Sequence, residues 1–165
     1  ASLTYFFKPE PVRPISFYNE RFWGLLQRLR LEDPSPWPSH IPTQTNNPAW
    51  TFCFDGEPIF PLCLTPANTK KRSRFSSTFC ISFQPRWTFA HHVPDAASMK
   101  KYSDLIRHRM EAFDLSDAPS HLGLYGEGYL DAEKYVFDDE NTKLPFPVSL
   151  DGATAFGENK IGVSQ

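Results

Sequence analysis

The chain has 165 residues, with 17 Lys and Arg against 19 Asp and Glu, and a formal net charge of -2. This length suits one domain, and 15 Phe, 6 Tyr and 4 Trp are too many aromatic residues for a disordered chain. The balanced charge excludes the basic surface typical of nucleic-acid binding, and the sequence lacks an apolar run long enough to cross a membrane. Three Cys without CxxC spacing argue against a disulfide scaffold and a thiolate zinc site, so a cytoplasmic location is expected.

The first third of the chain contains a predicted helix between two irregular stretches. Residues 1–15 are interrupted by prolines, and their aromatic patch Tyr5–Phe7 is expected to pair at a sheet edge or to cover a core. Apolar residues then recur every three to four positions, which predicts a helix over residues 16–31 with Ser16 as its N-cap. Five prolines in residues 33–48 indicate a long loop, which we interpret as a functional cover.

A β-hairpin is predicted next. Aromatic residues alternate with smaller ones over residues 50–54, and the turn dipeptide Asp55-Gly56 leads into a second apolar run at 59–64. Pro58 and Pro61 lack the N–H group that a strand donates. The second strand is therefore expected to be an edge strand, to contain a bulge, or to pair through alternate residues only.

A third strand and a second helix complete the expected elements. Residues 78–83 place Phe79, Ile81 and Phe83 on one face, as in a strand. A helix is predicted from Pro94, Asp95 or Ser98 onward, because six apolar residues form a stripe: Met99, Tyr102, Leu105, Ile106, Met110 and Phe113.

The order of these elements predicts an α+β fold. We expect a largely antiparallel sheet with two main helices packed on it, in a single domain over residues 1–150. The second helix is expected to pack across the sheet. Residues 151–165 are rich in small residues and are expected to form a loose C-terminal tail.

A basic loop is the most informative local feature. Four cations lie within residues 70–74, between two predicted strands, and their N–H groups can hold a carboxylate or phosphate by charge-assisted hydrogen bonds. Arg86 and Trp87 follow the third strand and add a guanidinium group and a stacking surface. The alternative interpretation is a solvated loop with surface Lys and Arg side chains.

Histidines and acidic residues offer further candidates. The five His lack the spacing of a zinc protease, and hydrolase and P-loop signatures such as GxSxG and GxxxxGK[ST] are absent from the sequence. His121, beside Gly123 in a predicted loop, has the most freedom to face a cavity. An acidic cluster near the C-terminal end can hold an amine or a guanidinium, or form a solvated loop: Glu127, Asp131, Glu133, Asp138, Asp139 and Glu140.

Residues 47–87, NPAWTFCFDGEPIFPLCLTPANTKKRSRFSSTFCISFQPRW, resemble the centre of the YqcI/YcgG family. The resemblance combines the aromatic strand, the Gly turn, the Thr-Pro-Ala segment, the RSR triplet and the FQPRW ending in one order. Weaker similarity continues through residues 99–113 and 122–137. The family includes heme-dependent N-oxygenases that hydroxylate a guanidino nitrogen in arginine-derived metabolites.

The resemblance implies a heme b enzyme that uses dioxygen or peroxide to hydroxylate an amine or guanidine nitrogen of a small amino-acid-derived substrate. The chain is expected to act without nucleic acid or membrane, and a homodimer is compatible with this activity. One His would ligate the iron, the Arg residues and Trp87 would hold the heme, and acidic groups would orient the substrate. The residues for these roles are His121 or His92 for the iron, Arg72, Arg74, Arg86 and Trp87 for the heme, and Glu127 and Glu133 for the substrate.

The sequence departs from the family pattern at two places. The family usually has about fifty more residues ahead of the first helix, including a Phe-Pro-Cys segment that this sequence lacks. Asn68 stands in the Thr-Pro-Ala-x position, where the family often has His, and an Asn amide is a poor axial ligand for heme iron. His121, His91 or His92 can take that role. The alternative function is a non-catalytic small-anion-binding or accessory domain that kept the scaffold and lost the heme ligand.

Overall fold

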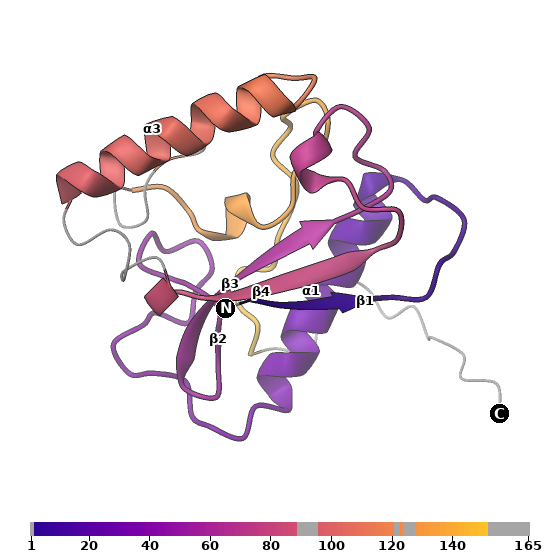
Figure 1. The fold of residues 1–165 in the computed structure, drawn as a ribbon. Coiled ribbons are helices and arrows are strands. Elements are labelled where there is room, and N and C mark those ends of the chain that lie inside the picture. Colours follow the sequence, from indigo (N-terminus) through magenta and orange to yellow (C-terminus); the bar gives the residue numbers. More distant parts are fainter. Residues whose placement is uncertain (1, 89–95, 121–122, 124–127, 152–165) are drawn as a thin grey trace, which may run out of the picture.

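The computed structural model describes residues 2–88, 96–120, 123 and 128–151. It confirms the α+β class (Figure 1). Four strands form one antiparallel sheet in the order β1-β4-β3-β2. The strands are β1 (Leu3–Phe6), β2 (Cys53–Phe54), β3 (Glu57–Leu64) and β4 (Cys80–Pro85), and the helices are α1 (Ile15–Leu31) and α3 (Ala96–Phe113), with two short 3₁₀ helices, η1 (Arg72–Arg74) and η2 (Ala132–Lys134). Within the described ranges, no helix is long and apolar enough to span a bilayer.

The N-terminal aromatic patch lies at a sheet edge, which is one of the two predicted positions. β1 pairs with β4 in antiparallel register, with Leu3 opposite Phe83 and Phe6 opposite Cys80. The next residue, Phe7, donates its backbone N–H to Phe79 O at 3.0 Å. The chain start is thereby joined to a strand almost eighty residues away.

The predicted hairpin is present, and its turn has the expected conformation. Asp55 and Gly56 have φ angles of 52° and 75°. Two consecutive residues with positive φ are typical of the type I′ turn, whose twist matches that of the two strands it joins. β2 is shorter than the predicted strand, because it contains only Cys53 and Phe54.

β3 accommodates Pro61 by pairing with β4 through alternate residues, which is one of the predicted arrangements, although β3 is not an edge strand. The N–H groups of Ile59 and Cys63 point away from β4 and bond to Phe52 O at 2.8 Å and Tyr135 O at 2.9 Å. Backbone direction alternates along a strand, so the nitrogen of Pro61 also points away from β4. Its missing N–H therefore removes no hydrogen bond between β3 and β4.

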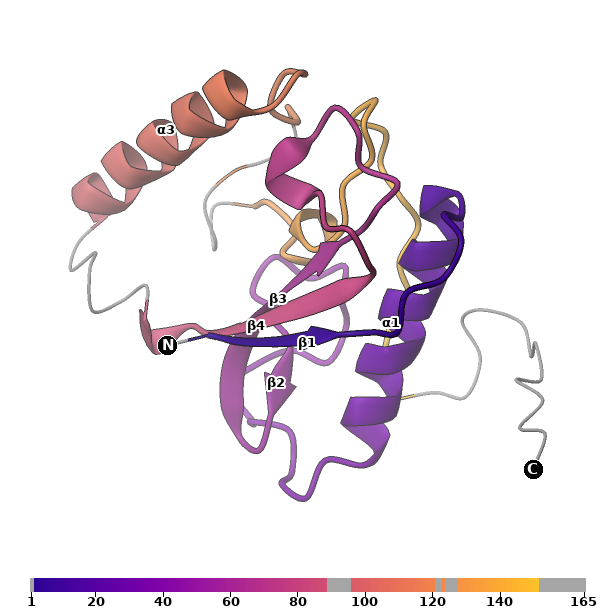
Figure 2. The same ribbon diagram turned by 45° about the vertical axis from the view of Figure 1, so that its right-hand side comes forward.

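Helix α1 covers one face of the sheet (Figure 2). The prediction of Ser16 as N-cap is wrong: the cap position is Pro14, without a side-chain hydrogen bond, and Pro14 O accepts the N–H of Phe17 at 3.0 Å. Proline is tolerated at this position because the N–H group that it lacks would have no partner within the helix. The apolar stripe enters a core shared with the sheet and the C-terminal segment: Tyr18, Phe22, Trp23, Leu26, Trp50, Phe52, Cys63, Phe79, Ile81, Ala132, Tyr135, Val136 and Leu150.

The proline-rich stretch 33–48 is irregular, as predicted, and it packs on the C-terminal segment. Gln44 forms an isolated antiparallel bridge with Ser149. The backbone N–H of Thr45 donates to Val148 O at 2.9 Å, and Thr45 is fully buried. The loop therefore holds the C-terminal segment against the core, and its expected role as a functional cover stays a prediction.

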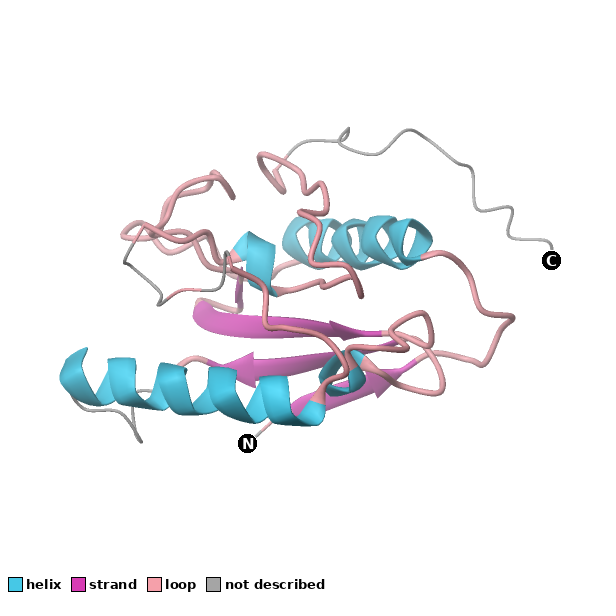
Figure 3. Cartoon of the chain, turned by 90° about the horizontal axis from the view of Figure 1, so that it is seen from above, coloured by secondary structure: helices cyan, strands magenta, loops and turns pink. Residues whose placement is uncertain are grey.

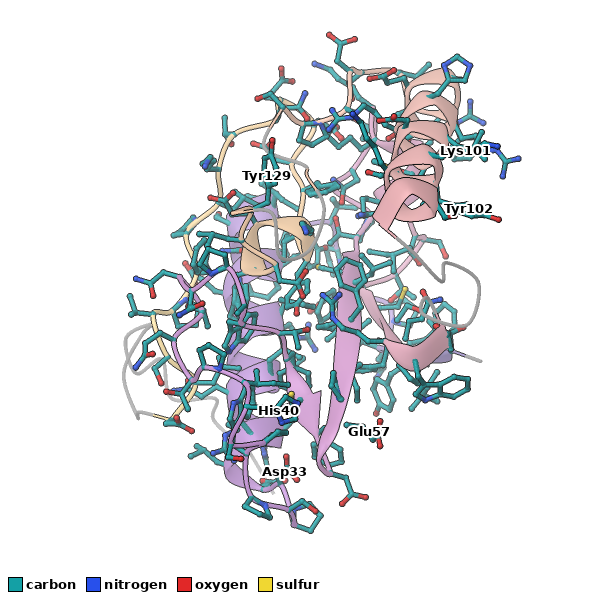
Figure 4. All side chains as sticks on the ribbon, turned by 90° about the vertical axis from the view of Figure 1, so that its left-hand side faces the viewer. Asp33, His40, Glu57, Lys101, Tyr102 and Tyr129 are labelled. Carbon is teal, nitrogen blue, oxygen red and sulfur yellow. The ribbon has the colours of Figure 1, made fainter. Side chains whose placement is uncertain are left out.

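Helix α3 lies on the side of the sheet opposite α1 (Figure 3), but its apolar stripe is not buried across the sheet as expected. Its contact with other elements is chiefly with η1, where the Arg72 guanidinium lies 4.6 Å from the Phe113 ring centroid. Tyr102 and Lys101 project outward from the helix (Figure 4). Large exposed fractions remain on Tyr102, Leu105, Ile106 and Phe113. The spacing of the apolar residues is sufficient to predict the helix. It does not determine whether those residues are buried.

Candidate functional site

The basic loop is folded inward at Lys71 and Arg74, whereas Lys70 and Arg72 are exposed. Lys71 has no exposed surface, and its ammonium donates to Ser116 Oγ at 3.1 Å and Asp117 O at 3.0 Å. Burial lowers the pKa of Lys71, and the neighbouring carboxylates, Asp114 first among them, oppose that shift. The Arg74 guanidinium lies 4.4 Å from the centroid of the Phe137 ring. These cations are thus part of the packed structure.

Carboxylates of the chain itself occupy the anion-binding groups of this loop. Asp139 Oδ2 accepts the N–H of Thr69 at 2.8 Å and of Lys70 at 3.0 Å, and Asp139 Oδ1 accepts the N–H of Lys71 at 3.0 Å. Asp114 accepts both the N–H and the hydroxyl of Ser73, each at 2.7 Å. Converging backbone N–H groups of this kind form an anion site. Here the predicted acidic cluster fills it, so the two features belong to one structure.

Arg86, a predicted cofactor-binding residue, belongs to a buried network around Asp131. Arg86 Nη2 pairs with Asp131 Oδ2, and Arg86 Nε donates to Thr51 Oγ1 at 2.7 Å. Asp131 Oδ2 also accepts the hydroxyls of Thr51 at 3.0 Å and Tyr135 at 2.9 Å. Asp131 is only 1% exposed. Trp87, in contrast, is largely exposed at the surface beyond β4.

The same network changes the proton affinity of its neighbours. The Lys134 ammonium lies 3.6 Å from Asp131 Oδ1, and burial lowers the pKa of Lys134 while Asp131 opposes that shift. Burial and then the charge of Asp131 raise the pKa of the Tyr135 hydroxyl well above 10.0. The Tyr135 hydroxyl therefore keeps its proton at neutral pH and donates a hydrogen bond to Asp131.

A small cavity lies on the other side of the same segment. It encloses about 10 Å³ and is lined by Asn19, Trp23, Ala132, Glu133, Val136, Thr142, Lys143, Leu144 and Phe146. A space of this size holds about one water molecule. Glu133, predicted to bind substrate, is mostly buried here and accepts the Lys143 ammonium at 2.8 Å.

Several predicted residues lie outside the described part of the chain, namely His91, His92, His121 and Glu127. In the described ranges, no three His, Cys, Asp or Glu side chains are grouped to hold a metal. His40, on the proline-rich loop, and His108, on α3, are both exposed (Figure 4 labels His40).

Asn68, at the position where the family often has His, is a structural residue here. It is 1% exposed, its Oδ1 accepts the Thr65 hydroxyl at 2.8 Å, and its Nδ2 donates to Phe137 O at 2.8 Å. Both ends of the amide are therefore engaged. Asn68 therefore has no free group to offer a heme iron.

Sequence reasoning missed Asn19 and did not select Asp131 within the acidic cluster. Asn19 carries a usable signal, because it is a polar residue on the apolar face of the first helix, one turn before Trp23. The sequence contains no signal for the pairing of Asp131 with Arg86, because the two residues are 45 positions apart.

Comparison with known proteins gives a consistent result. The model of the YqcI/YcgG family matches residues 1–148. The chain is 42% identical to YqcI of Bacillus subtilis over 88% of its length, and 42% identical to YcgG of the same organism over 80%. It is 34% identical, over 75% of its length, to a Streptomyces lavendulae protein named "Putative N(omega)-hydroxy-L-arginine synthase DcsA". The chain spans 61%, 54% and 47% of these relatives, respectively. None of the solved structures matches it.

Proposed function

Since the chain belongs to the YqcI/YcgG family, we propose that it is part of an N-oxygenase acting on an amine or guanidine nitrogen of a small amino-acid-derived substrate. The observation that carries this proposal is the 34% identity to the protein named as an N(omega)-hydroxy-L-arginine synthase. The match covers 125 residues, or 75% of this chain. The activity is proposed for the whole protein, of which the chain corresponds to about half in that relative.

Transfer of oxygen to nitrogen requires a redox cofactor, because ordinary side chains do not activate dioxygen or peroxide. We propose heme b for this role, on the resemblance to heme-dependent members of the family. The axial ligand is then sought in the two segments outside the described residues that contain His92 and His121.

The cofactor is tested by titrating the purified protein with hemin and following the Soret band. We expect a shift that saturates at one heme per chain and is lost in His121→Ala or in His92→Ala. The double variant Arg72→Ala/Arg74→Ala is the second arm, and it is expected to weaken binding if these residues hold the propionates. A flat titration with folded protein contradicts heme binding.

The reaction is tested by incubating the heme-loaded protein with L-arginine or L-lysine, an electron donor and dioxygen, or with hydrogen peroxide. We expect a product heavier by one oxygen atom, located on nitrogen by fragmentation in mass spectrometry. Omission of hemin is the matched control. Failure to form an N-hydroxylated product with heme bound contradicts the proposed activity.

The alternative of a small-anion-binding domain has weaker support. Its proposed donors are the Lys and Arg side chains of residues 70–74, but Lys71 is buried and bonds to Ser116 and Asp117, and Lys70 pairs with Glu140. The backbone N–H groups of residues 69–71 already bond to Asp139. An external anion would therefore compete with groups of the chain at most of these positions. Addition of phosphate is therefore expected to leave the melting temperature unchanged beyond the effect of ionic strength.

A further inference from the structure

The cavity beside η2 has walls of mixed character. Trp23 and Phe146 provide aromatic surface, with ring centroids 6.0 Å apart, and Ala132, Val136 and Leu144 provide aliphatic surface. The polar groups at the cavity come from Asn19, Glu133, Thr142 and Lys143. Thr142 already bonds to Asp138 through both its N–H and its hydroxyl. The polar groups available to bind a ligand are therefore the amide oxygen of Asn19 and the carboxylate of Glu133, with Lys143 beside them.

The amide of Asn19 has one end bonded and the other end unmet. Its Nδ2 donates to Pro145 O at 2.8 Å, and a carbonyl oxygen can only accept, so the orientation of the amide is determined. Asn19 Oδ1 is buried and has no hydrogen-bond donor among the described residues, and Asn19 is 1% exposed. A buried hydrogen-bond acceptor without a donor is energetically unfavourable. A ligand that donates a hydrogen bond to this oxygen would remove that cost.

Glu133 provides the negative charge. Its side chain is 11% exposed, and its Oε1 accepts the ammonium of Lys143 at 2.8 Å, whereas Lys143 itself is 64% exposed. The chain therefore already places one primary ammonium group against this carboxylate. An exposed lysine is held weakly and can be displaced, because such a pair is screened and its side chain loses entropy.

We propose that this cavity binds the primary ammonium group of a small amine. An ammonium group is about the size of a water molecule, carries three N–H donors in an alkylamine, and is positive. It therefore suits the enclosed volume of about 10 Å³, the unmet oxygen of Asn19, the carboxylate of Glu133 and the aromatic rings of Trp23 and Phe146. A guanidinium group, a plane of four heavy atoms, needs more room than an ammonium group and fits this space less well. The further statement that this ammonium group belongs to the amino-acid-derived substrate depends on the proposed function. The proposal that the cavity binds an ammonium group does not depend on it.

Binding is tested by NMR with ¹³C-methylammonium as the probe. We expect intermolecular NOEs from its methyl group to the rings of Trp23 and Phe146. Tetramethylammonium, which has the same charge and no N–H, and guanidinium are the comparison ions, and both are expected to bind at least about tenfold more weakly. The absence of these NOEs, or equal affinity for methylammonium and tetramethylammonium, overturns the proposal.

Variants separate this site from a general surface effect. Glu133→Gln and Asn19→Leu are each expected to weaken methylammonium binding by about tenfold. Lys143→Met removes the internal competitor and is expected to strengthen binding by about threefold, a gain that unfolding cannot produce. Glu140→Gln is the matched control, because Glu140 is an exposed carboxylate that pairs with Lys70 and does not line the cavity. Equal weakening by Glu133→Gln and Glu140→Gln, or no gain in Lys143→Met, contradicts the proposal.

The outcome is distinguishable from the test of the enzyme activity. Methylammonium binding that follows this variant pattern, without N-hydroxylation of any amine, supports the site and contradicts the proposed function. N-hydroxylation by a protein that shows no NOEs to Trp23 and Phe146 supports the function and overturns the site.

Discussion

At the scale of single residues, Asp131 is the group on which the buried charges depend. Arg86 and Lys134 both lie against it, and its side chain is 1% exposed. Asp131→Asn keeps the shape and leaves an oxygen for the hydroxyls of Thr51 and Tyr135, but it removes the charge. We expect the free energy of unfolding to decrease by about 3–5 kcal/mol, because the buried negative charge that faces both Arg86 and Lys134 is then lost. Urea denaturation at neutral pH measures this change.

The matched control is Glu32→Gln. Glu32 forms an ion pair with Arg28 on the outside of α1, and their side chains are 63% and 75% exposed. Such solvent-exposed pairs contribute little to stability, so this variant is expected to unfold at the same urea concentration as the wild type. Similar losses in Asp131→Asn and Glu32→Gln would show that burial of the Asp131 network has no energetic consequence.

The sequence shows which residues at these positions are charged, but it does not show which of them form ion pairs with each other. The acidic cluster and Arg86 were both visible in the sequence as charged candidates. Which acid meets Arg86 is decided by the packing of β4 against the segment that contains η2, 45 positions later. Local spacing contains no information about that contact.

At the scale of elements, local patterns predicted α1 and the hairpin because their causes are local. The dipeptide Asp55-Gly56 takes positive φ at both positions, a conformation that glycine adopts without a steric penalty. Gly56→Ala is expected to lower the free energy of unfolding by about 1–2 kcal/mol, because the added Cβ disfavours this backbone although the space around it is open.

Gly24→Ala is the same chemical change, but it is expected to raise the free energy of unfolding. Gly24 lies within α1, and an added Cβ meets no heavy atom within 4 Å. Alanine restricts the unfolded chain and favours the helix, so stability is expected to rise by about 0.5–1 kcal/mol. Urea denaturation of both variants measures these changes. If Gly56→Ala were the more stable variant, backbone conformation would not decide the effect of these two substitutions.

Helix α3 shows where the element-scale prediction ends. Its apolar stripe has helical spacing, but Leu105 is 40% exposed and Ile106 is 53% exposed. The double variant Leu105→Gln/Ile106→Gln is therefore expected to leave the melting temperature of this chain nearly unchanged. Leu26→Ala, on the buried face of α1, is expected to cost about 2–5 kcal/mol. A comparable loss from the α3 variant, measured by calorimetry, would show that the stripe is buried in solution.

At the scale of the whole molecule, the sheet order and the closure of the loops depend on contacts between distant residues. β1 pairs with β4 in preference to its neighbours in sequence, and the basic loop bonds to acids near residue 139. Local periodicity predicts that strands and charged loops exist, but it cannot select among their pairings. The α+β class was therefore predictable, whereas the order of strands and the internal use of the basic loop were not.

Asp139 joins two halves of the molecule, because its carboxylate accepts the N–H groups of Thr69, Lys70 and Lys71. Partial burial alone would raise its pKa, but these backbone hydrogen bonds, that of Lys71 foremost, hold it below the ordinary value of 3.8. Because the folded pKa is the lower one, the contribution of Asp139 to stability is complete above pH 3.8 and is lost as the pH falls through the folded pKa.

Asp139→Ala is therefore expected to lower the free energy of unfolding at neutral pH by about 1–3 kcal/mol. The difference from the wild type is expected to shrink as the pH decreases below the ordinary value of 3.8, because the wild-type carboxyl then also becomes protonated. Urea denaturation over a series of pH values measures both effects. Glu140→Ala, next in sequence and bonded only through the exposed side chain of Lys70, is the control and is expected to show no measurable loss. A loss for Asp139→Ala that stayed constant into strong acid would mean that the charge of Asp139 does not hold the two loops together.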